Sequence, residues 1–128
     1  MIIKLPFPAA ELFPNRKNGK HWTATNEVKE VQKCLAYAYT KQAMVAAQTD
    51  FGNGNIPLSL VYLTPDKRKR DIDNMLAASK ALLDGMAQAL GVDDSRFKPI
   101  LVDWVQGPKG GGLIAAVGIS IVSSVNLG

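Results

Sequence analysis

Hydrophobic and polar residues follow one another in stretches that predict a short strand, a long helix, a strand and a second helix. Residues 2–5 are β-prone and end at a proline, and residues 25–47 carry apolar side chains at intervals of three to four. Residues 58–63 are a second β-prone run, and residues 74–90 repeat the helical spacing and stop at Gly91. We therefore expect helices over residues 25–47 and 74–90.

The last third of the sequence is typical of a β-hairpin. Residues 99–105 and 113–122 are β-prone and flank a glycine-rich turn over residues 107–112. The predicted order is β-α-β-α-β-β. We expect one α/β (α+β) domain over residues 1–128, with a small mixed sheet and two main helices.

Composition narrows the class of protein. The chain has 128 residues, of which 47% are hydrophobic, and this fits a folded domain and excludes a disordered chain. No apolar run approaches the roughly 18 to 20 residues of a membrane-spanning helix, and the first residues lack a signal-peptide pattern. We expect a cytoplasmic protein without a membrane partner. One cysteine (Cys34) and one histidine (His21) exclude a disulfide framework and a Cys/His metal cluster, so any metal should be held by carboxylates.

Positive charge is concentrated in two loops. Fifteen Lys and Arg against eleven Asp and Glu give a net charge of +4. A basic strip holds phosphates, so we assign DNA contacts to these loops, with an ordinary solvated loop as the alternative. The residues concerned are Lys67, Arg68, Lys69 and Arg70 in one loop and Arg16, Lys17 and Lys20 in the other.

Two carboxylates, Asp71 and Asp73, directly follow the four consecutive basic residues. They are two residues apart where an extended segment meets a helix, so their side chains are expected on the same side of the chain. Their mutual repulsion favours a cation between them, and hard oxygen ligands favour Mg²⁺ or Mn²⁺. The alternative is that Asp71 balances Arg70 while Asp73 caps the helix.

Lys80 lies two helical turns beyond Asp73 and is expected on the same face of the helix. From there its ammonium group could neutralise charge on a scissile phosphate. An ion pair with Asp84, one turn further on, is the alternative.

Asp93 and Asp94 follow the stop signal Gly91 and add two more carboxylates. A continuous helix over residues 74–90 would be about 25 Å long, and the few loop residues after it cannot easily return that distance. We therefore predict that Asp94 completes the site of a partner subunit, which an antiparallel pair of these helices would allow.

These motifs together resemble the RusA family of phage-type Holliday junction resolvases. The most specific match is Arg-Asp-x-Asp-Asn at residues 70–74, followed about twenty residues later by Asp-Asp at residues 93–94. Leu-Pro-Phe-Pro at residues 5–8, Pro-Asn at residues 14–15, His-Trp at residues 21–22 and Lys-Gly-Gly-Gly at residues 109–112 are similar to the family's flanking segments. The resemblance covers nearly the whole chain.

The resemblance implies a homodimeric, Mg²⁺-dependent endonuclease that nicks four-way DNA junctions symmetrically. It assigns metal binding to Asp71, Asp73 and Asp94, with Asp93 as the alternative third ligand, and the role of catalytic lysine to Lys80. In the best-known form of the family the lysine falls one helical turn earlier, at position 77 of this sequence.

Two other functions share the same residues. The first is a metal-dependent nuclease or phosphodiesterase that acts on another nucleic-acid structure. The second is a non-catalytic DNA- or RNA-binding module, in which residues 67–70 contact phosphates and the aspartates are structural.

Overall fold

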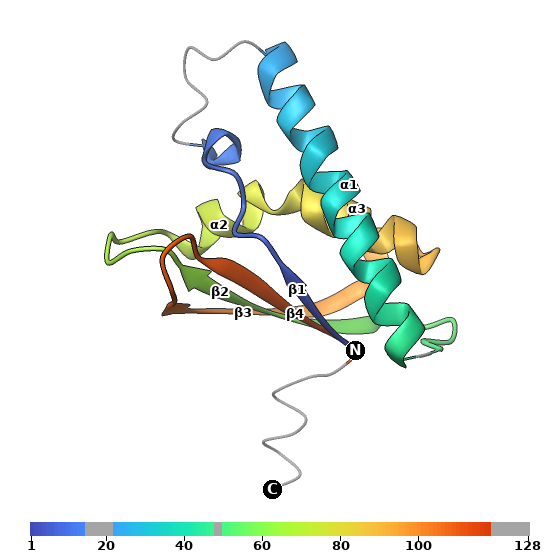
Figure 1. Cartoon of the computed structure of the whole chain (residues 1–128). Helices are drawn as coiled ribbons and strands as arrows, with labels where there is room; N and C mark the ends of the chain where they lie inside the picture. The colour runs from blue at the N-terminus through green and yellow to red at the C-terminus, as the bar shows by residue number, and fades with distance from the viewer. Residues whose placement is uncertain (15–21, 48–49, 119–128) are drawn as a thin grey trace, which may run out of the picture.

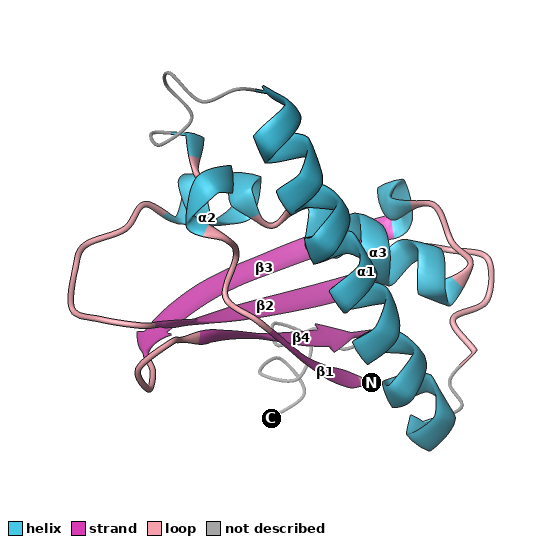
Figure 2. Cartoon of the chain, turned by 45° about the horizontal axis from the view of Figure 1, so that its top comes forward, coloured by secondary structure: helices cyan, strands magenta, loops and turns pink. Residues whose placement is uncertain are grey.

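The computed structural model describes residues 1–14, 22–47 and 50–118 of the chain. In these residues four strands form one mixed sheet, and the helices lie on one of its faces (Figure 1; Figure 2). The elements are β1 (Ile2–Leu5), η1 (Ala10–Leu12), α1 (Trp22–Ala47), β2 (Ile56–Thr64), α2 (Ile72–Ala78), α3 (Lys80–Leu90), η3 (Asp94–Arg96), β3 (Phe97–Gln106) and β4 (Gly112–Val117), where η marks a single 3₁₀ turn.

The sheet has the strand order β1-β4-β2-β3. β2 runs parallel to β3, and β4 runs antiparallel to both β1 and β2, so that Leu60 lies opposite Val102 on one side and Ala115 on the other. The prediction of a small mixed sheet is confirmed. The predicted terminal hairpin is wrong, because β2 lies between β3 and β4.

The turn between β3 and β4 explains this difference. The Gly107 N–H donates to the Thr64 carbonyl over 2.8 Å, and a Cβ atom placed on Gly111 would lie 2.6 Å from the Leu63 carbonyl oxygen. The turn therefore passes closely over the end of β2, at a position where only glycine fits. Turn chemistry indicates that a chain reverses, but it does not specify which strand the returning segment pairs with.

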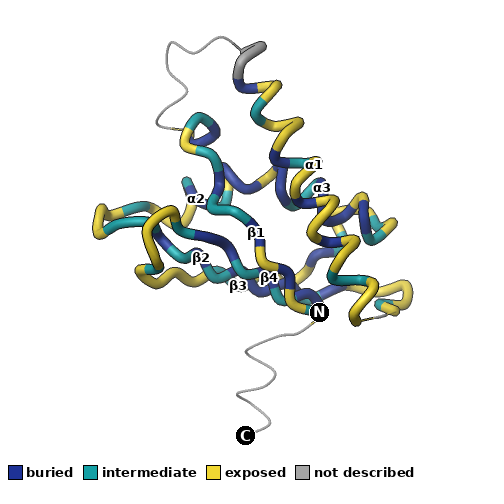
Figure 3. The backbone as a smooth tube through the Cα atoms, viewed as in Figure 1, coloured by how far each residue is buried: buried dark blue, intermediate teal, exposed yellow. Residues whose placement is uncertain are grey.

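The core lies between the sheet and the helices (Figure 3). Leu58, Leu60 and Tyr62 alternate along β2 and are almost completely buried, as are Leu82 and Met86 of α3. Removing such a side chain from water stabilises the fold by about 1.5 to 3 kcal/mol. The period-2 pattern of β2 thus fixes the face that the helices cover.

The helices differ from the prediction in two respects. The helix predicted over residues 25–47 is α1 and begins at Trp22. The helix predicted over residues 74–90 is divided into α2 and α3, so the described chain has three α-helices rather than two main ones. The observed order in the described ranges is β-α-β-α-α-β-β.

Candidate functional site

Two carboxylates lie at the beginning of α2. Asp71 is the N-cap residue, with φ −80° and ψ 134°, and its carbonyl accepts the N–H of Met75 over 3.1 Å. Asp73 lies in the first turn of the helix, and both residues are exposed. The helix therefore begins at Ile72, ahead of the residue 74 predicted from the sequence, and the N-cap is Asp71 rather than Asp73.

A buried serine separates α2 from α3. The Ser79 hydroxyl donates to the Met75 carbonyl over 2.7 Å and shares a 2.8 Å hydrogen bond with the Tyr62 hydroxyl. A serine that bonds the carbonyl four residues earlier competes with the helical hydrogen-bond pattern and bends the helix. Lys80 therefore begins a new helix, whose direction is tied to β2 through Tyr62.

A groove of about 450 Å³ lies along α2, α3 and the first half of β3. The Lys80 ammonium nitrogen is 4.0 Å from a carboxylate oxygen of Asp94, and both side chains are well exposed. An exposed ion pair of this length contributes little to stability, so it shows where the two groups lie rather than what holds them there. We call this feature the α2–α3 groove, and its lining residues are Asp73, Leu76, Ala77, Lys80, Leu83, Asp94, Phe97 and Ile100.

Asp93 and Asp94 have different surroundings. The Asp93 carboxylate accepts the N–H of Ser95 over 2.9 Å, which lowers the pKa of Asp93. The pKa of Asp94 is raised, first by a side-chain hydrogen bond with Asp84 and then by partial burial, while Lys80 acts in the opposite direction. Asp94, and not Asp93, is the carboxylate that faces the α2–α3 groove.

The position of Asp94 corrects the prediction drawn from helix length. Gly91 ends α3 in the left-handed conformation with φ 71°, and the chain then turns back along the helix. Together with the break at Ser79, this return places Asp94 beside Lys80 of the same chain. The sequence-based argument fails because it treats residues 74–90 as one straight helix. The ion pair predicted as the alternative role of Lys80 also has a different partner, which is Asp94 and not Asp84.

The three carboxylates that the resemblance assigns to a metal do not converge as a set. Among residues 1–14, 22–47 and 50–118, no three His, Cys, Asp or Glu side chains lie close enough to hold a metal ion together. Asp73 and Asp94 line the α2–α3 groove, whereas Asp71 is not among its lining residues. Mg²⁺ is usually held by one or two carboxylates and completes its shell with water and substrate phosphates. Asp73 and Asp94 line one groove and are carboxylates of the kind that such a site uses, and Asp94 also shares a hydrogen bond with Asp84.

Asp66 organises the basic loop between β2 and α2. Its carboxylate accepts hydrogen bonds from two guanidinium nitrogens of Arg70, over 2.9 and 3.2 Å, and from the backbone and side chain of Arg68. The Arg70 hydrogen bonds, followed by those of Arg68, hold the pKa of Asp66 well below its usual range. The positive charge that remains uncompensated in this loop therefore comes mainly from Lys67 and Lys69, which are exposed.

Arg70 is held inside the molecule rather than presented to solvent. Its side chain is only 13% exposed, and its guanidinium carbon lies 5.4 Å from the centre of the Phe7 ring. Of the predicted DNA contacts, Lys67, Arg68 and Lys69 are exposed. The remaining three, Arg16, Lys17 and Lys20, lie outside the residues that the structure describes.

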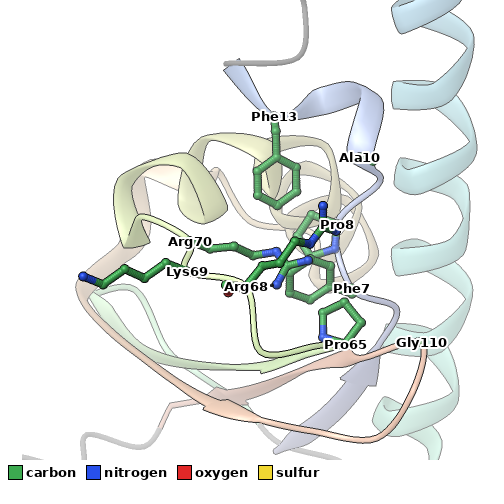
Figure 4. Close-up of a pocket in the computed structure, with 9 residues that line it drawn as sticks. All are labelled: Phe7, Pro8, Ala10, Phe13, Pro65, Arg68, Lys69, Arg70 and Gly110. Carbon is green, nitrogen blue, oxygen red and sulfur yellow. Dashed lines mark hydrogen bonds between the residues drawn. The ribbon is translucent and has the colours of Figure 1, made fainter.

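Arg70 forms part of a second hollow, which we call the Phe7 cavity (Figure 4). Its volume is about 340 Å³, and sequence reasoning did not predict it. The only signal in the sequence is a pair of phenylalanines in a proline-rich segment, without the periodicity that would place them. Its lining residues are Phe7, Pro8, Ala10, Phe13, Pro65, Arg68, Lys69, Arg70 and Gly110.

Comparison with known proteins identifies a relative of this chain. It is 32% identical over 106 residues to an uncharacterized protein of Xylella fastidiosa strain Temecula1, a match that covers 81% of this chain and 68% of the relative. No model of a known protein family matches the chain. In the described ranges, no helix is both long enough and apolar enough to cross a membrane. The extent and identity of the match show that the chain belongs to the same family as the Xylella fastidiosa protein.

Proposed function

We propose that the protein is a Mg²⁺-dependent endodeoxyribonuclease that nicks branched DNA, four-way junctions in particular, as a homodimer. The observation that carries the proposal is the α2–α3 groove, where Asp73, Lys80 and Asp94 from three successive segments lie together. The cationic loop of residues 67–70 directly precedes this groove along the chain. The same residues form the motif that resembles the RusA resolvases.

The carboxylates have the role of binding the metal. Asp73 and Asp94 would hold Mg²⁺, or Mn²⁺, together with water and a phosphate oxygen of the DNA, and the resemblance adds Asp71 as a third carboxylate. When bound, such an ion activates a water molecule and stabilises charge on the leaving oxygen.

Lys80 has the role of stabilising the phosphate. Its ammonium group lies at the same groove as the two carboxylates, 4.0 Å from an oxygen of Asp94. In the reaction, water adds to phosphorus, the bond from phosphorus to the 3′ oxygen breaks, and that oxygen takes up a proton. A fixed ammonium group stabilises the negative charge that builds up on the phosphate oxygens during this displacement.

The test uses the full chain with a labelled four-way junction and a linear duplex of the same arm sequence. We expect nicking of the junction in Mg²⁺, little cleavage of the duplex, and none of either in EDTA. Asp73→Asn should lower the cleavage rate by about 100-fold or more, as expected for a group that acts on the reacting phosphate. Asp50→Asn is the matched control, because Asp50 is an exposed turn residue far along the sequence from the groove, and asparagine supports the same turn.

Two results would contradict the proposal. Equal cleavage of duplex and junction would indicate a nuclease without structure specificity. Binding of the junction without cleavage in any divalent metal would indicate a DNA-binding module, in which the aspartates have a structural role.

A further inference from the structure

The Phe7 cavity brings together three segments that are distant in the sequence. The N-terminal segment that follows β1 supplies Phe7 and Phe13, the loop after β2 supplies Pro65 and the cationic side chains, and the turn before β4 supplies Gly110 (Figure 4). Neither Asp73 nor Asp94 belongs to it, so it is separate from the α2–α3 groove. Its volume of about 340 Å³ suits a ligand of moderate size.

One wall of the cavity is aromatic and fixed in orientation. The rings of Phe7 and Phe13 are stacked, with their centres 5.9 Å apart and their planes inclined by 22°. The rings of Phe7 and Tyr62 pack in a T-shaped arrangement, with their centres 6.3 Å apart and an interplanar angle of 81°. Because Tyr62 belongs to the buried centre of β2, this wall is part of the rigid core rather than of a free loop.

Cationic side chains lie directly beside the aromatic wall, and Arg70 is held in place there. The Arg70 guanidinium lies over the Phe7 ring and is held by two hydrogen bonds to Asp66. Arg68 and Lys69 also line the cavity, and Lys69 extends outward from it in Figure 4. Arg68 and Arg70 share the carboxylate of Asp66, and Lys69 adds a third cation, so positive charge is in excess here.

From this geometry we propose that the Phe7 cavity binds a single unpaired nucleotide of a DNA strand. The base packs against the surface formed by the phenylalanine rings and the Arg70 guanidinium, and its phosphate contacts Arg68 and Lys69. The inference rests on the proposed function in taking DNA as the partner, but it does not require cleavage.

The chemistry of the two walls selects this ligand. Aromatic rings and arginine planes are the surfaces on which proteins stack unpaired bases, and lysines and arginines bind the adjoining phosphates. A free inorganic anion would use only the cationic wall, and an apolar peptide would leave the positive charges unpaired. The nucleotide must be unpaired because a base within a duplex has both faces covered by its neighbours. A branch point is a place where DNA can supply such a nucleotide.

The experiment measures the affinity of the full-length Asp73→Asn protein for a fluorescent eight-nucleotide oligo-dT without metal. The second probe is a series of the same strand in which one base is replaced by an abasic site, at a different central position in each member of the series. We expect the loss of one particular base to weaken binding about tenfold, since stacking of one base contributes roughly 1 to 3 kcal/mol. Phe13→Leu should weaken binding of the complete strand by a similar factor and remove its preference over the abasic strand.

Three further variants separate loss of the site from loss of folding. Arg68→Gln changes an exposed side chain, so the fold should persist, and we expect a several-fold loss of affinity. Phe51→Leu is the matched control for Phe13→Leu, because Phe51 packs beside Gly118 and does not line the cavity. Lys41→Gln, on α1, is the control for the change in charge. Neither control should alter affinity by more than about twofold.

The outcomes distinguish this inference from the proposed nuclease function. If the wild type cleaves junctions while base removal and Phe13→Leu leave oligo-dT affinity unchanged, the nucleotide site is overturned and the function stands. The same holds if oligo-dT does not bind at all. If base removal and both cavity variants weaken binding as expected but no DNA is cleaved in any metal, the nuclease function fails and the nucleotide site stands.

Discussion

The α2–α3 groove and the Phe7 cavity are built in opposite ways. The groove takes its charged residues from one continuous stretch, residues 73–94, and combines both signs of charge with an apolar wall. The cavity takes its walls from the N-terminal segment, residues 65–70 and the turn before β4, and combines two phenylalanine rings with cations alone. Carboxylates beside a lysine suit chemistry on a phosphate, whereas aromatic rings beside cations suit holding a nucleotide.

This difference separates what each region should affect in experiments. Changes in the α2–α3 groove should alter the rate of cleavage and leave DNA affinity nearly unchanged. Changes in the Phe7 cavity should alter DNA affinity and leave the rate at which bound DNA is cleaved nearly unchanged. The predictions below test this division.

The largest effect is expected at Lys80. Lys80→Ala should slow junction cleavage about 100-fold while changing junction affinity only a few-fold, because the ammonium group acts on charge that develops in the reaction. The rate is measured under single-turnover conditions, with Lys41→Ala as the control. If Lys80→Ala lowers only the melting temperature, the lysine has a structural role and the groove is not the reaction site.

The next effect is on stability, at the break between α2 and α3. Ser79→Ala removes the hydroxyl that bonds Tyr62 and the Met75 carbonyl, and it leaves a buried hydroxyl without its partner. We expect the free energy of unfolding to fall by about 1 to 3 kcal/mol in urea titrations. Tyr62→Phe combined with Ser79→Ala should cost less than the sum of the two single changes. Additive losses would show that the two hydroxyl groups are not coupled.

A smaller effect is expected from the ionisation of Tyr62 at high pH. Burial raises the pKa of Tyr62 to about 12, although its hydrogen bond to Ser79 acts in the opposite direction. Because the folded-state pKa lies above the unfolded value of about 10, this stabilisation is complete below about pH 10 and is lost as the pH rises towards 12. Tyr62→Phe should flatten the decline in unfolding free energy over that range by about 1 to 2 kcal/mol. An unchanged decline would contradict this assignment.

The smallest effect distinguishes residues within the basic loop. Replacing both Lys67 and Lys69 with glutamine should remove one to two phosphate contacts. Each lost contact should reduce the slope of log affinity against log salt concentration by about 0.9. Arg70→Gln should instead lower thermal stability, since Arg70 is held by Asp66 and lies over Phe7. If Arg70→Gln changes only the salt slope, the arginine contacts a DNA phosphate instead of supporting the fold.

Patterns local in the sequence predicted much of the fold and part of the groove. The period-2 pattern of β2 and the helical spacing of α1 depend on neighbours along the chain, and the structure places both elements close to expectation, whereas Asp71 lies outside the groove that Asp73 lines. The break at Ser79 was not predicted because it depends on a hydrogen bond to Tyr62, a residue on another element. A serine within a helical pattern does not by itself reveal such a partner.

The remaining differences arise from contacts between distant segments. The insertion of β2 between β3 and β4, and the meeting of Phe7 with Arg70, are decided by strand pairing and packing rather than by local propensity. The return of Asp94 to Lys80 depends both on the break at Ser79 and on the turn at Gly91. Sequence spacing alone could not distinguish this arrangement from one in which Asp94 reaches a partner subunit.

The measurement that tests the account most directly asks whether Asp73 and Asp94 act within one chain. Mixed dimers, purified through two different affinity tags, would combine one Asp73→Asn subunit with one Asp94→Asn subunit. Dimers of one wild-type and one Asp73→Asn subunit serve as the positive control and should nick a single strand of the junction. We expect the mixed mutant dimers to nick nothing, because each chain lacks one carboxylate of its own groove. Single-strand nicking by the mixed mutant dimers would contradict this expectation, because one intact site would then have been formed between two chains.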